Sequence, residues 1–235
     1  TGHGTYEQGR PRELDFQPAG KANGLGVHES QSRLWENQIG RSLEFCHWSL
    51  PLWKEAFPEK MQDIDAEMLW RAVNVVEPSL IRVEADEATY NIHIMIRYEI
   101  EKLLISGDLE VDELPGKWDD MYEEYLGIRP TDNSSGVLQD IHWSMGAIGY
   151  FPTYTLGNLY SAQLLSAARG DLPEHDLQIR RGDFSPLLDW MRRKVHGRGS
   201  ILEPAELIEE ATGEAPSPEA FVDYLRDKVK RLYSV

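Results

Sequence analysis

Apolar residues recur every three or four positions along most of this chain, which is the period of a helix with one buried face. In the segment 84–106, for example, Ile96, Ile100 and Leu103 follow this spacing. The same period, bounded by capping residues and prolines, predicts helices over 28–48, 65–75, 84–106, 112–126, 154–169, 174–181, 184–196, 204–211 and 218–232.

The helix predicted over 65–75 has a recognisable beginning and end. Asp65 is a capping residue, because its carboxylate can accept hydrogen bonds from the first free N–H groups of a helix. Pro78 then stops the helical run. The apolar spacing predicts an inward face formed by Met68, Leu69, Ala72 and Val76.

Two segments between the helices carry their own information. Residues 79–83 are apolar and β-branched, which predicts a short strand or an extended piece. Residues 127–149 are rich in Gly, Ser, Asn and Asp and predict a long loop, a feature that is usually functional in a compact domain. Because no repeat or clear linker interrupts the chain, we expect one mainly α unit over 1–235, with at most a short β segment.

Charge and cysteine content narrow the class of protein. The chain has 24 Lys and Arg against 40 Asp and Glu, a formal net charge of −16. Nucleic acids and anionic membrane surfaces bind basic footprints, so we expect neither as a partner. The single cysteine, Cys46, excludes an internal disulfide and a Cys-based zinc ribbon, and it favours a reducing, cytoplasmic setting. We expect Cys46 to pack on a helix face.

The first residues of the chain resemble the end of a metal-binding helix. In a His-Glu-x-x-His helix two histidines four positions apart bind Zn²⁺, and the glutamate activates a water molecule. His3 would be the second histidine, and the first histidine and the glutamate would precede Thr1. We therefore interpret the start as lying inside a helix of a longer protein. Taken alone, the segment is weak evidence for a metal site, and the alternative is an ordinary histidine.

Glu29 is a candidate third metal ligand. It lies 26 residues after His3, beyond a glycine-containing segment at 20–26, and a helix that begins near His28 could present it to the same metal. The alternative is that His28 and Glu29 form a polar helix start, where an acidic group suits the helix dipole.

Two further segments carry polar groups next to apolar ones. Arg82 stands between Ile81 and Val83 and is a candidate for bidentate binding of a carboxylate. Farther on, Asp140 and His142 form an Asp-x-His pair in which a carboxylate can orient an imidazole. Tyr150 and Tyr154 offer phenols that can donate to an oxyanion. The alternatives are a capped helix start at 82–87 and a packed aromatic loop at 136–154.

Together the four segments resemble the motif set of the M32 family of metallocarboxypeptidases, the carboxypeptidase Taq type. That set is His-Glu-x-x-His, His-Glu-Ser-Gln, Ile-Arg-x-x-Ala-Asp and Gly-x-x-Gln-Asp-x-His-Trp. The chain carries the last three in full, at 28–31, 81–86 and 136–143, and the final histidine of the first. The upstream family motifs His-Pro-Phe and Asp-x-Arg-x-Thr do not occur. The resemblance therefore implies the C-terminal half of such an enzyme, with a bundle-like helical zinc metallopeptidase fold.

The resemblance also implies roles for individual residues. His3 and Glu29 match zinc ligands, with Co²⁺ or Mn²⁺ as possible substitutes. The substrate side is implied to include Arg82, Gln139 and Asp140, with Arg82 binding the C-terminal carboxylate of a peptide. The implied catalytic group is His142, Tyr150 and Tyr154, with the two tyrosines stabilising the tetrahedral intermediate.

These roles imply a zinc-dependent metallocarboxypeptidase that removes C-terminal amino acids from peptides, in a family known for homodimers. The first zinc histidine and the general-base glutamate match no residue of the chain, so we expect this polypeptide alone to bind zinc poorly and to be inactive. The alternative is a non-catalytic remnant or scaffold protein on the same fold. A helical binding module unrelated to metallopeptidases would have to acquire three full motifs by chance.

Overall fold

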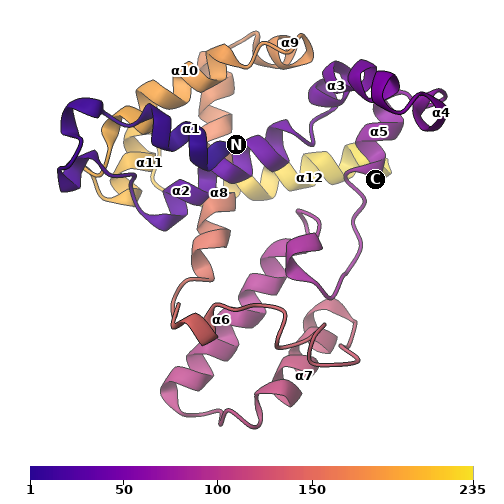
Figure 1. The fold of residues 1–235 in the computed structure, drawn as a ribbon, viewed down its shortest axis with the longest axis vertical. Helices are drawn as coiled ribbons and strands as arrows, with labels where there is room; N and C mark the ends of the chain where they lie inside the picture. Colours follow the sequence, from indigo (N-terminus) through magenta and orange to yellow (C-terminus); the bar gives the residue numbers. More distant parts are fainter. Residues whose placement is uncertain (235) are drawn as a thin grey trace. The chain divides into compact units, whose positions relative to one another are not determined.

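The computed structural model describes residues 1–234 as helices joined by turns and loops (Figure 1). No β-strand occurs among these described residues, which confirms the mainly α fold. None of the helices in this part of the chain combines the length and the apolar character needed to cross a membrane. The contacts divide the chain into two compact units. One unit comprises residues 1–74 and the described residues from 156 onward, and the other comprises 75–155.

The first unit is an assembly of short and medium helices around a large apolar core. Its centre contains Tyr6, Leu34, Leu164 and Trp190, all at most 1% exposed. Its α-helices are α1 (Gly2–Gly9), α2 (Leu25–Arg33), α3 (Leu43–Ala56), α4 (Pro58–Met61), α5 (Ala66–Ala72), the greater part of α8 (Pro152–Asp171), α9 (His175–Arg180), α10 (Ser185–Lys194), α11 (Pro204–Thr212) and α12 (Glu219–Tyr233).

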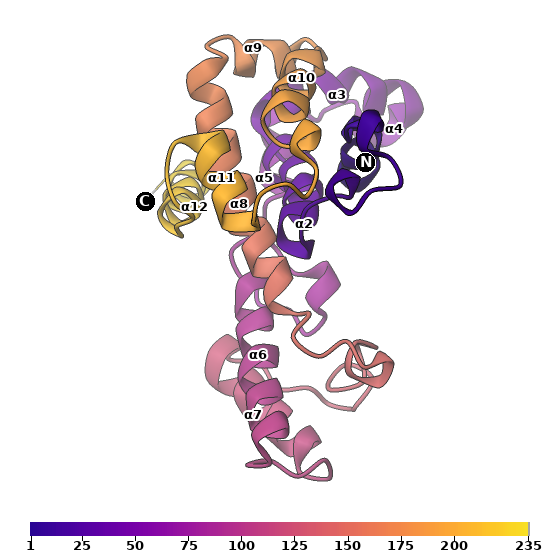
Figure 2. The ribbon, with the colours of Figure 1, turned by 90° about the vertical axis from the view of Figure 1, so that its left-hand side faces the viewer.

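Glycines allow α2 to lie very close to two other helices of this unit. A Cβ atom at Gly2 of α1 would stand 2.1 Å from the carbonyl oxygen of Gln31 in α2. A Cβ atom at Gly157 of α8 would stand 2.6 Å from Cγ of Glu29 in α2. Only glycine fits at such contacts. The backbones of α1 and α8 therefore approach α2 directly, and α1 and α2 lie side by side in both ribbon views (Figures 1 and 2).

The second unit is built on two helices, α6 (Tyr90–Ser106) and α7 (Leu114–Leu126), with short 3-10 turns η4 (Arg82–Glu84) and η5 (Trp143–Met145). Both helices end at glycines in the left-handed conformation, as expected for helix C-termini. The predicted long loop is confirmed at 127–149, except for η5, and Val137 and Trp143 of this loop pack against the core. That core is formed by Ile96, Ile100, Trp118, Met121, Tyr122 and Leu126.

Three predicted elements need correction. Helix α6 begins at Tyr90 rather than at 84, because the Asp86 carboxylate accepts hydrogen bonds from the N–H groups of Ala88 and Thr89 and holds a turn there. Of the two alternatives predicted for 79–83, the strand is wrong and the extended piece holds at Ile81, after which η4 begins at Arg82. The helical run predicted over 28–48 is interrupted, since α2 continues as a π-helix, η3 (Leu34–Ile39), and α3 starts separately after the Ser42 cap.

The inward face predicted for 65–75 was right for Leu69, which packs against an apolar cluster, but wrong for Met68 and Ala72, and the predicted cap was right. Asp65 accepts a hydrogen bond from the N–H of Met68 at 2.8 Å, and the helix is α5. Met68 and Ala72 are exposed, whereas Ala66 and Trp70 are buried. The large Trp70 ring takes the buried face and packs in a cluster with Cys46 and Leu232. The packed position predicted for Cys46 is thus confirmed. The remaining predicted helices correspond to α7–α12 with shifts of a few residues at their ends.

Candidate functional site

His3 and Glu29, the two sequence-predicted metal ligands, meet across α1 and α2. Nε2 of His3 lies 3.3 Å from Oε2 of Glu29. The His3 side chain is about half exposed at 49%, whereas that of Glu29 is 14% exposed. The close approach of the two helices at Gly2 is what brings a residue of the first turn of α1 next to the middle of α2.

The remaining polar atoms of both side chains have other partners. Nδ1 of His3 lies 3.0 Å from the carbonyl oxygen of His28 and can only donate to it. Donation from Nδ1 leaves the lone pair of the neutral imidazole on Nε2, the atom that faces Glu29. Oε1 of Glu29 accepts a hydrogen bond of 2.7 Å from Nε of Arg33, so Oε2 is the oxygen that faces His3. The two free lone pairs therefore point at the same space.

This arrangement fits a divalent metal. With metal–nitrogen and metal–oxygen bonds of about 2.0–2.2 Å, tetrahedral geometry puts two ligand atoms about 3.3–3.5 Å apart. The 3.3 Å between Nε2 and Oε2 matches that separation. An imidazole and a carboxylate are also an established donor set for zinc. Within residues 1–234 no group of three or more His, Cys, Asp and Glu side chains is arranged to hold a metal, so a metal at this place would have His3 and Glu29 as its ligands from the described residues.

A chain of polar side chains on α1 and α2 continues from His3. His28 lies with Nδ1 2.6 Å from Nδ1 of His3 and Nε2 3.0 Å from Oε1 of Glu7. Glu7 in turn accepts a 2.7 Å hydrogen bond from Nε of Arg10. Burial alone would raise the pKa of Glu7, but the hydrogen bond with His28 and the charge of Arg10 outweigh it and lower the pKa. Sequence reasoning missed Glu7, although its position four residues after His3 puts both on one helix face.

In the second unit, Arg82 and Asp140 form a buried ion pair. Nη2 of Arg82 donates to Oδ1 of Asp140 at 2.6 Å and Nε donates to the same oxygen at 3.1 Å. Nη1 of Arg82 donates to the Tyr90 hydroxyl at 2.9 Å, and the guanidinium lies 4.8 Å from the ring centroid of Tyr154. Only 6% of Arg82 is exposed.

A second arginine shares the same carboxylate. Nε and Nη2 of Arg97 lie 2.7 and 2.6 Å from Oδ2 of Asp140, and Arg97 is fully buried. Two guanidiniums on one carboxylate leave a net positive charge. Burial would raise the pKa of Asp140, but the hydrogen bond from Arg82 and the charge of Arg97 outweigh it and lower the pKa. Burial likewise opposes the charge of Arg82, yet its bonds to Asp140 raise its pKa above the ordinary value.

Gln139 fixes the loop that carries Asp140. Its Oε1 accepts a 2.9 Å hydrogen bond from the backbone N–H of Arg82. Its Nε2 lies 3.0 Å from the carbonyl oxygens of Leu80 and Ser135 and 3.1 Å from that of Gly136. Both ends of the amide therefore tie the segment at 80–82 to the loop at 135–139.

His142 lies in an aromatic surrounding. Its Nε2 is 3.0 Å from the Tyr154 hydroxyl, and its Nδ1 is 3.6 Å from Oδ1 of Asp140. Its ring centroid is 4.4 Å from that of Phe151 and 5.3 Å from that of Tyr150. Burial lowers the pKa of His142, although the Asp140 charge acts in the opposite direction. The predicted group of Arg82, Gln139, Asp140, His142, Tyr150 and Tyr154 is thus brought together in this unit.

Residues 1–229 match the sequence model of the family described as "Carboxypeptidase Taq (M32) metallopeptidase". The chain belongs to this M32 family. It is 50% identical over 232 residues to the Thermostable carboxypeptidase 1 of Thermus thermophilus and 44% identical over 235 residues to the Carboxypeptidase 1 of Bacillus subtilis. These matches cover 99% of the chain but 45% and 46% of those relatives, so the chain spans about half the length of the curated relatives it matches.

Solved M32 structures have the same fold. The M32 carboxypeptidase of Deinococcus radiodurans matches 100% of this chain and 47% of its own, with 44% identity and a TM-score of 0.96. The Trypanosoma cruzi metallocarboxypeptidase 1 matches 100% of this chain and 46% of its own, with 40% identity and a TM-score of 0.92. The all-helical architecture of this M32 chain is therefore shared by both solved structures.

Several buried groups of this M32 chain were missed by sequence reasoning. His93, Arg97 and Glu101 stand four residues apart and form a polar stripe along the buried face of α6. Glu101 accepts hydrogen bonds of 2.7 Å from Nε1 of Trp143 and from the N–H of Gly149, so it anchors the loop. A spacing of four within an otherwise apolar helix face was the signal that could have found this stripe.

Proposed function

We propose that this protein is a zinc-dependent metallocarboxypeptidase that releases C-terminal amino acids from peptides. Membership of the M32 family and the carboxypeptidase names of its relatives support this proposal. The observation that carries it is the 3.3 Å approach of Nε2 of His3 to Oε2 of Glu29. We also propose that residues 1–235 form the C-terminal part of a single helical catalytic domain. The order of the motifs at 28–31, 81–86 and 136–143, which are the later ones of the family set, supports this assignment together with the coverage of 45–47% in the relatives.

In this proposal His3 and Glu29 hold the metal. The backbone carbonyl of His28 fixes the tautomer of His3, and Arg33 orients the Glu29 carboxylate. A bound zinc ion supplies Lewis acidity, which makes a water molecule acidic near neutral pH and polarises a carbonyl group. Zinc is proposed because an imidazole and a carboxylate suit it, with Co²⁺ or Mn²⁺ as substitutes.

The Arg82 cluster would supply recognition of the chain end. An exopeptidase needs a fixed cation, because a free carboxylate distinguishes the last residue of a peptide from all others. Arg82 and Arg97 carry two positive charges against the one negative charge of Asp140, and the surplus is available to a substrate carboxylate. Gln139 and Asp140 then act on the substrate side as positioning residues, since their polar atoms are engaged with Arg82 and its neighbouring backbone.

His142, Tyr150 and Tyr154 are proposed as the catalytic group of this unit. A phenol can donate a hydrogen bond to the oxyanion of a tetrahedral intermediate. The Tyr154 hydroxyl is held 3.0 Å from Nε2 of His142, and the lowered pKa of His142 favours a neutral imidazole there. A cytoplasmic location and a homodimer complete the proposal. The single cysteine is typical of proteins that fold in a reducing compartment.

The test uses the protein at the full length that its gene encodes. Its metal content and its release of amino acids from a peptide are measured for the parent protein and for His3→Ala and Glu29→Gln. We expect about one bound metal per chain in the parent, and loss of metal and of hydrolysis in both variants. Matched controls are His47→Ala, which removes a histidine of α3, and Glu36→Gln, which changes an exposed acid of η3.

Each outcome is informative. Full metal content in His3→Ala or Glu29→Gln would contradict the assigned ligands. A metal-loaded parent protein that releases no C-terminal residue from any peptide tested would contradict the peptidase and would favour a non-catalytic protein on the same fold. Loss of metal in the control variants as well would mean that the substitutions act through folding, and the assignment would fail.

A further inference from the structure

The first unit contains a hollow of about 650 Å³, and neither His3 nor Glu29 is among the residues that line it. Four parts of the same unit line it: the end of η3 with the turn before α3, Trp70 of α5, the middle and end of α8, and one side of α12. Volumes of about 300–1,000 Å³ are typical of small-molecule sites. The π-helix η3 ends at this hollow, and π-helical turns in proteins are frequent at functional sites.

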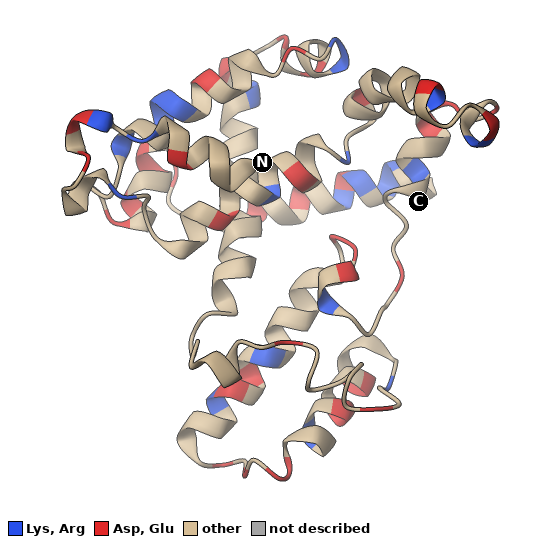
Figure 3. Cartoon of the chain, in the orientation of Figure 1, with Lys and Arg blue, Asp and Glu red and all other residues tan. Residues whose placement is uncertain are grey.

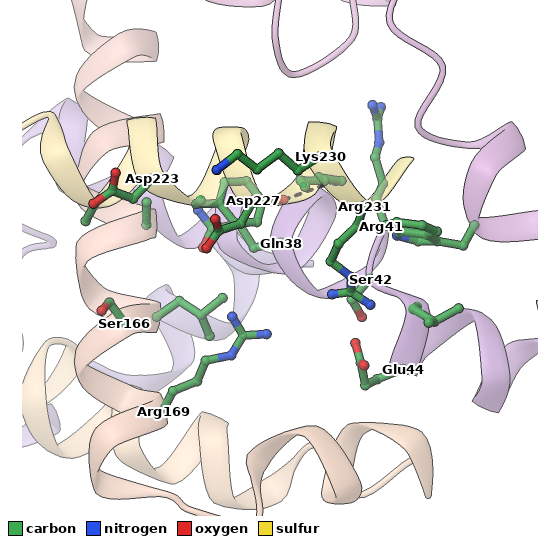
Figure 4. A pocket seen from close by; sticks show the side chains of 17 residues that line it. Gln38, Arg41, Ser42, Glu44, Ser166, Arg169, Asp223, Asp227, Lys230 and Arg231 are labelled. Atoms are coloured by element: carbon green, nitrogen blue, oxygen red, sulfur yellow. Dashed lines mark hydrogen bonds between the residues drawn. The ribbon is translucent and has the colours of Figure 1, made fainter. Parts of the chain in front are cut away.

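The charge of the hollow is opposite to that of the chain. Its lining contains five Lys and Arg side chains and three carboxylates, whereas the whole chain carries a net charge of −16. Several of the basic residues lie on the C-terminal half of α12 (Figure 3). Figure 4 shows the Arg169 side chain extending from α8 toward the hollow, and Arg41 lines the hollow from the turn before α3. A local excess of cations in an acidic protein attracts anions.

Hydrogen bonds from Asn74 and Ser42 hold the turn that carries Arg41. The carbonyl oxygen of Arg41 accepts a 3.0 Å hydrogen bond from Nδ2 of Asn74, whose side chain is buried. Ser42 caps α3 by accepting from the N–H of Phe45, and its hydroxyl donates to the carbonyl oxygen of Ile39. Within the described residues the Arg41 side chain takes part in no hydrogen bond or ion pair. Its guanidinium is therefore available to bind a ligand.

The α12 side of the hollow carries a carboxylate, which accepts hydrogen bonds, and an aromatic ring. Asp227 of α12 points into the hollow (Figure 4), and Tyr224 lines it one turn earlier. Asp223 is already engaged with Arg226 at 2.6 Å, whereas no other described residue is hydrogen-bonded to the Asp227 carboxylate. A carboxylate of this kind accepts hydrogen bonds from hydroxyl groups. The hollow thus pairs an anion-binding side with a hydroxyl-binding side.

We infer that this hollow binds a small organic phosphate that carries hydroxyl groups, of the chemical class of a sugar phosphate. The phosphate would lie between Arg41, whose guanidinium can bind phosphate oxygens in bidentate fashion, and Arg169, whose Nη2 also donates to Oδ1 of Asp176 at 3.2 Å. The hydroxyl groups would donate to Asp227. Two arginines from separate segments suit a doubly charged phosphate better than the single charge of a carboxylate. This site is independent of the proposed peptidase.

Titration calorimetry on the protein at its full encoded length tests the inference, with glucose 6-phosphate, glucose and inorganic phosphate as probes. Glucose 6-phosphate should bind saturably and at least about tenfold more tightly than inorganic phosphate, and glucose should not bind. Arg41→Gln and Arg169→Gln should each weaken binding about tenfold or more, since each removes a charged hydrogen-bonding partner. The matched control, Arg193→Gln, replaces an exposed arginine of α10 and should leave binding unchanged.

Absence of saturable binding by glucose 6-phosphate would overturn the inference. If inorganic phosphate bound as tightly as glucose 6-phosphate, the proposal of an organic phosphate would be wrong, because the hydroxyl groups and Asp227 would then contribute nothing to binding. Binding that survives the Arg41→Gln and Arg169→Gln substitutions would place the ligand elsewhere. Circular dichroism of each variant, compared with Arg193→Gln, distinguishes a lost contact from a lost fold.

Discussion

The His3–Glu29 pair and the Arg82–Asp140–Arg97 cluster differ in their burial and in whether their polar groups already have partners. The His3 side chain is half exposed, and its Nε2 faces a carboxylate oxygen with lone pairs directed at a common space. In the cluster, the arginines are at most 6% exposed and the Asp140 carboxylate accepts from both of them. The first arrangement suits a ligand that is still to be bound. In the second, the carboxylate is already paired with both arginines, and only one surplus positive charge is left for a ligand.

This difference in burial predicts which substitutions affect ligand binding and which affect the free energy of unfolding. Exposed pairs contribute little to the free energy of unfolding, because water and salt screen them. Removal of one partner from a buried ion pair is costly, because an uncompensated charge stays in a low-dielectric surrounding. We therefore expect substitutions at the His3–Glu29 pair to affect metal binding, and substitutions in the Arg82–Asp140–Arg97 cluster to affect folding as well.

The largest effect is expected for Asp140→Asn, which leaves the buried guanidiniums of Arg82 and Arg97 without a counter-charge. The free energy of unfolding should fall by about 3–5 kcal/mol. Urea unfolding followed by tryptophan fluorescence measures it, with Asp132→Asn in the exposed part of the same loop as the control. A loss below about 1 kcal/mol would mean that the cluster does not hold this unit together.

A smaller effect is expected where α8 meets Glu29, the proposed metal ligand. In Gly157→Ala the new methyl group would stand 2.6 Å from Cγ of Glu29 and would displace it. Overpacking of this kind costs about 1–3 kcal/mol. Metal affinity, measured by competition with a chelator, should fall together with stability. Gly170→Ala on the same helix is the control, because no atom outside the helix backbone lies within 4 Å of its added Cβ, and it should leave metal affinity unchanged.

A pH dependence should come from His93 beside the Arg97 side chain. Burial, helped by the charge of Arg97, lowers the pKa of His93 from 6.5 to about 4. The unfolded chain therefore takes up a proton as pH falls below 6.5, while the folded chain stays neutral until about pH 4. Stability is fully present above pH 6.5 and is lost progressively between these values, by about 1 kcal/mol from this group at pH 5.5.

The His93 effect is measured as the difference in unfolding free energy between pH 7 and pH 5.5 in the parent protein and in His93→Gln. The variant should lose less stability over this interval by about 1 kcal/mol. Equal losses in both proteins would show that His93 takes up its proton equally well in the folded state.

The smallest effect on stability is expected for Glu29→Gln. The glutamine amide keeps an oxygen that can accept the hydrogen bond from Nε of Arg33, so the free energy of unfolding in metal-free buffer should change by about 1 kcal/mol or less. The same variant should lose its metal, as proposed above. A large loss of stability without metal would instead place Glu29 among the structural residues, beside Asp140.

Local signals made much of the fold predictable. Asp65 caps α5, and α6 and α7 end at Gly107 and Gly127, because such effects depend on neighbouring residues alone. The start of α6 was placed too early because the Asp86 turn competes with the helix for the same N–H groups. The π-helix η3 has no such local signature in the sequence.

The candidate site was predictable to a lesser degree. Arg82, Asp140 and His142 were found through their motifs, whereas Arg97 was missed, because its partner Asp140 lies 43 residues away and only packing brings them together. The meeting of His3 with Glu29 likewise depends on Gly2 and Gly157, whose role is visible only when the helices are seen in contact. Periodicity predicts the helices, but it does not predict which polar groups they bring together.

Anomalous diffraction at the zinc absorption edge, on crystals of the full-length protein, tests the central claim most directly. We expect one strong peak about 2.0–2.2 Å from both Nε2 of His3 and Oε2 of Glu29. A metal peak bonded to neither atom would contradict the claim that the approach of α1 to α2 builds half of a metal site.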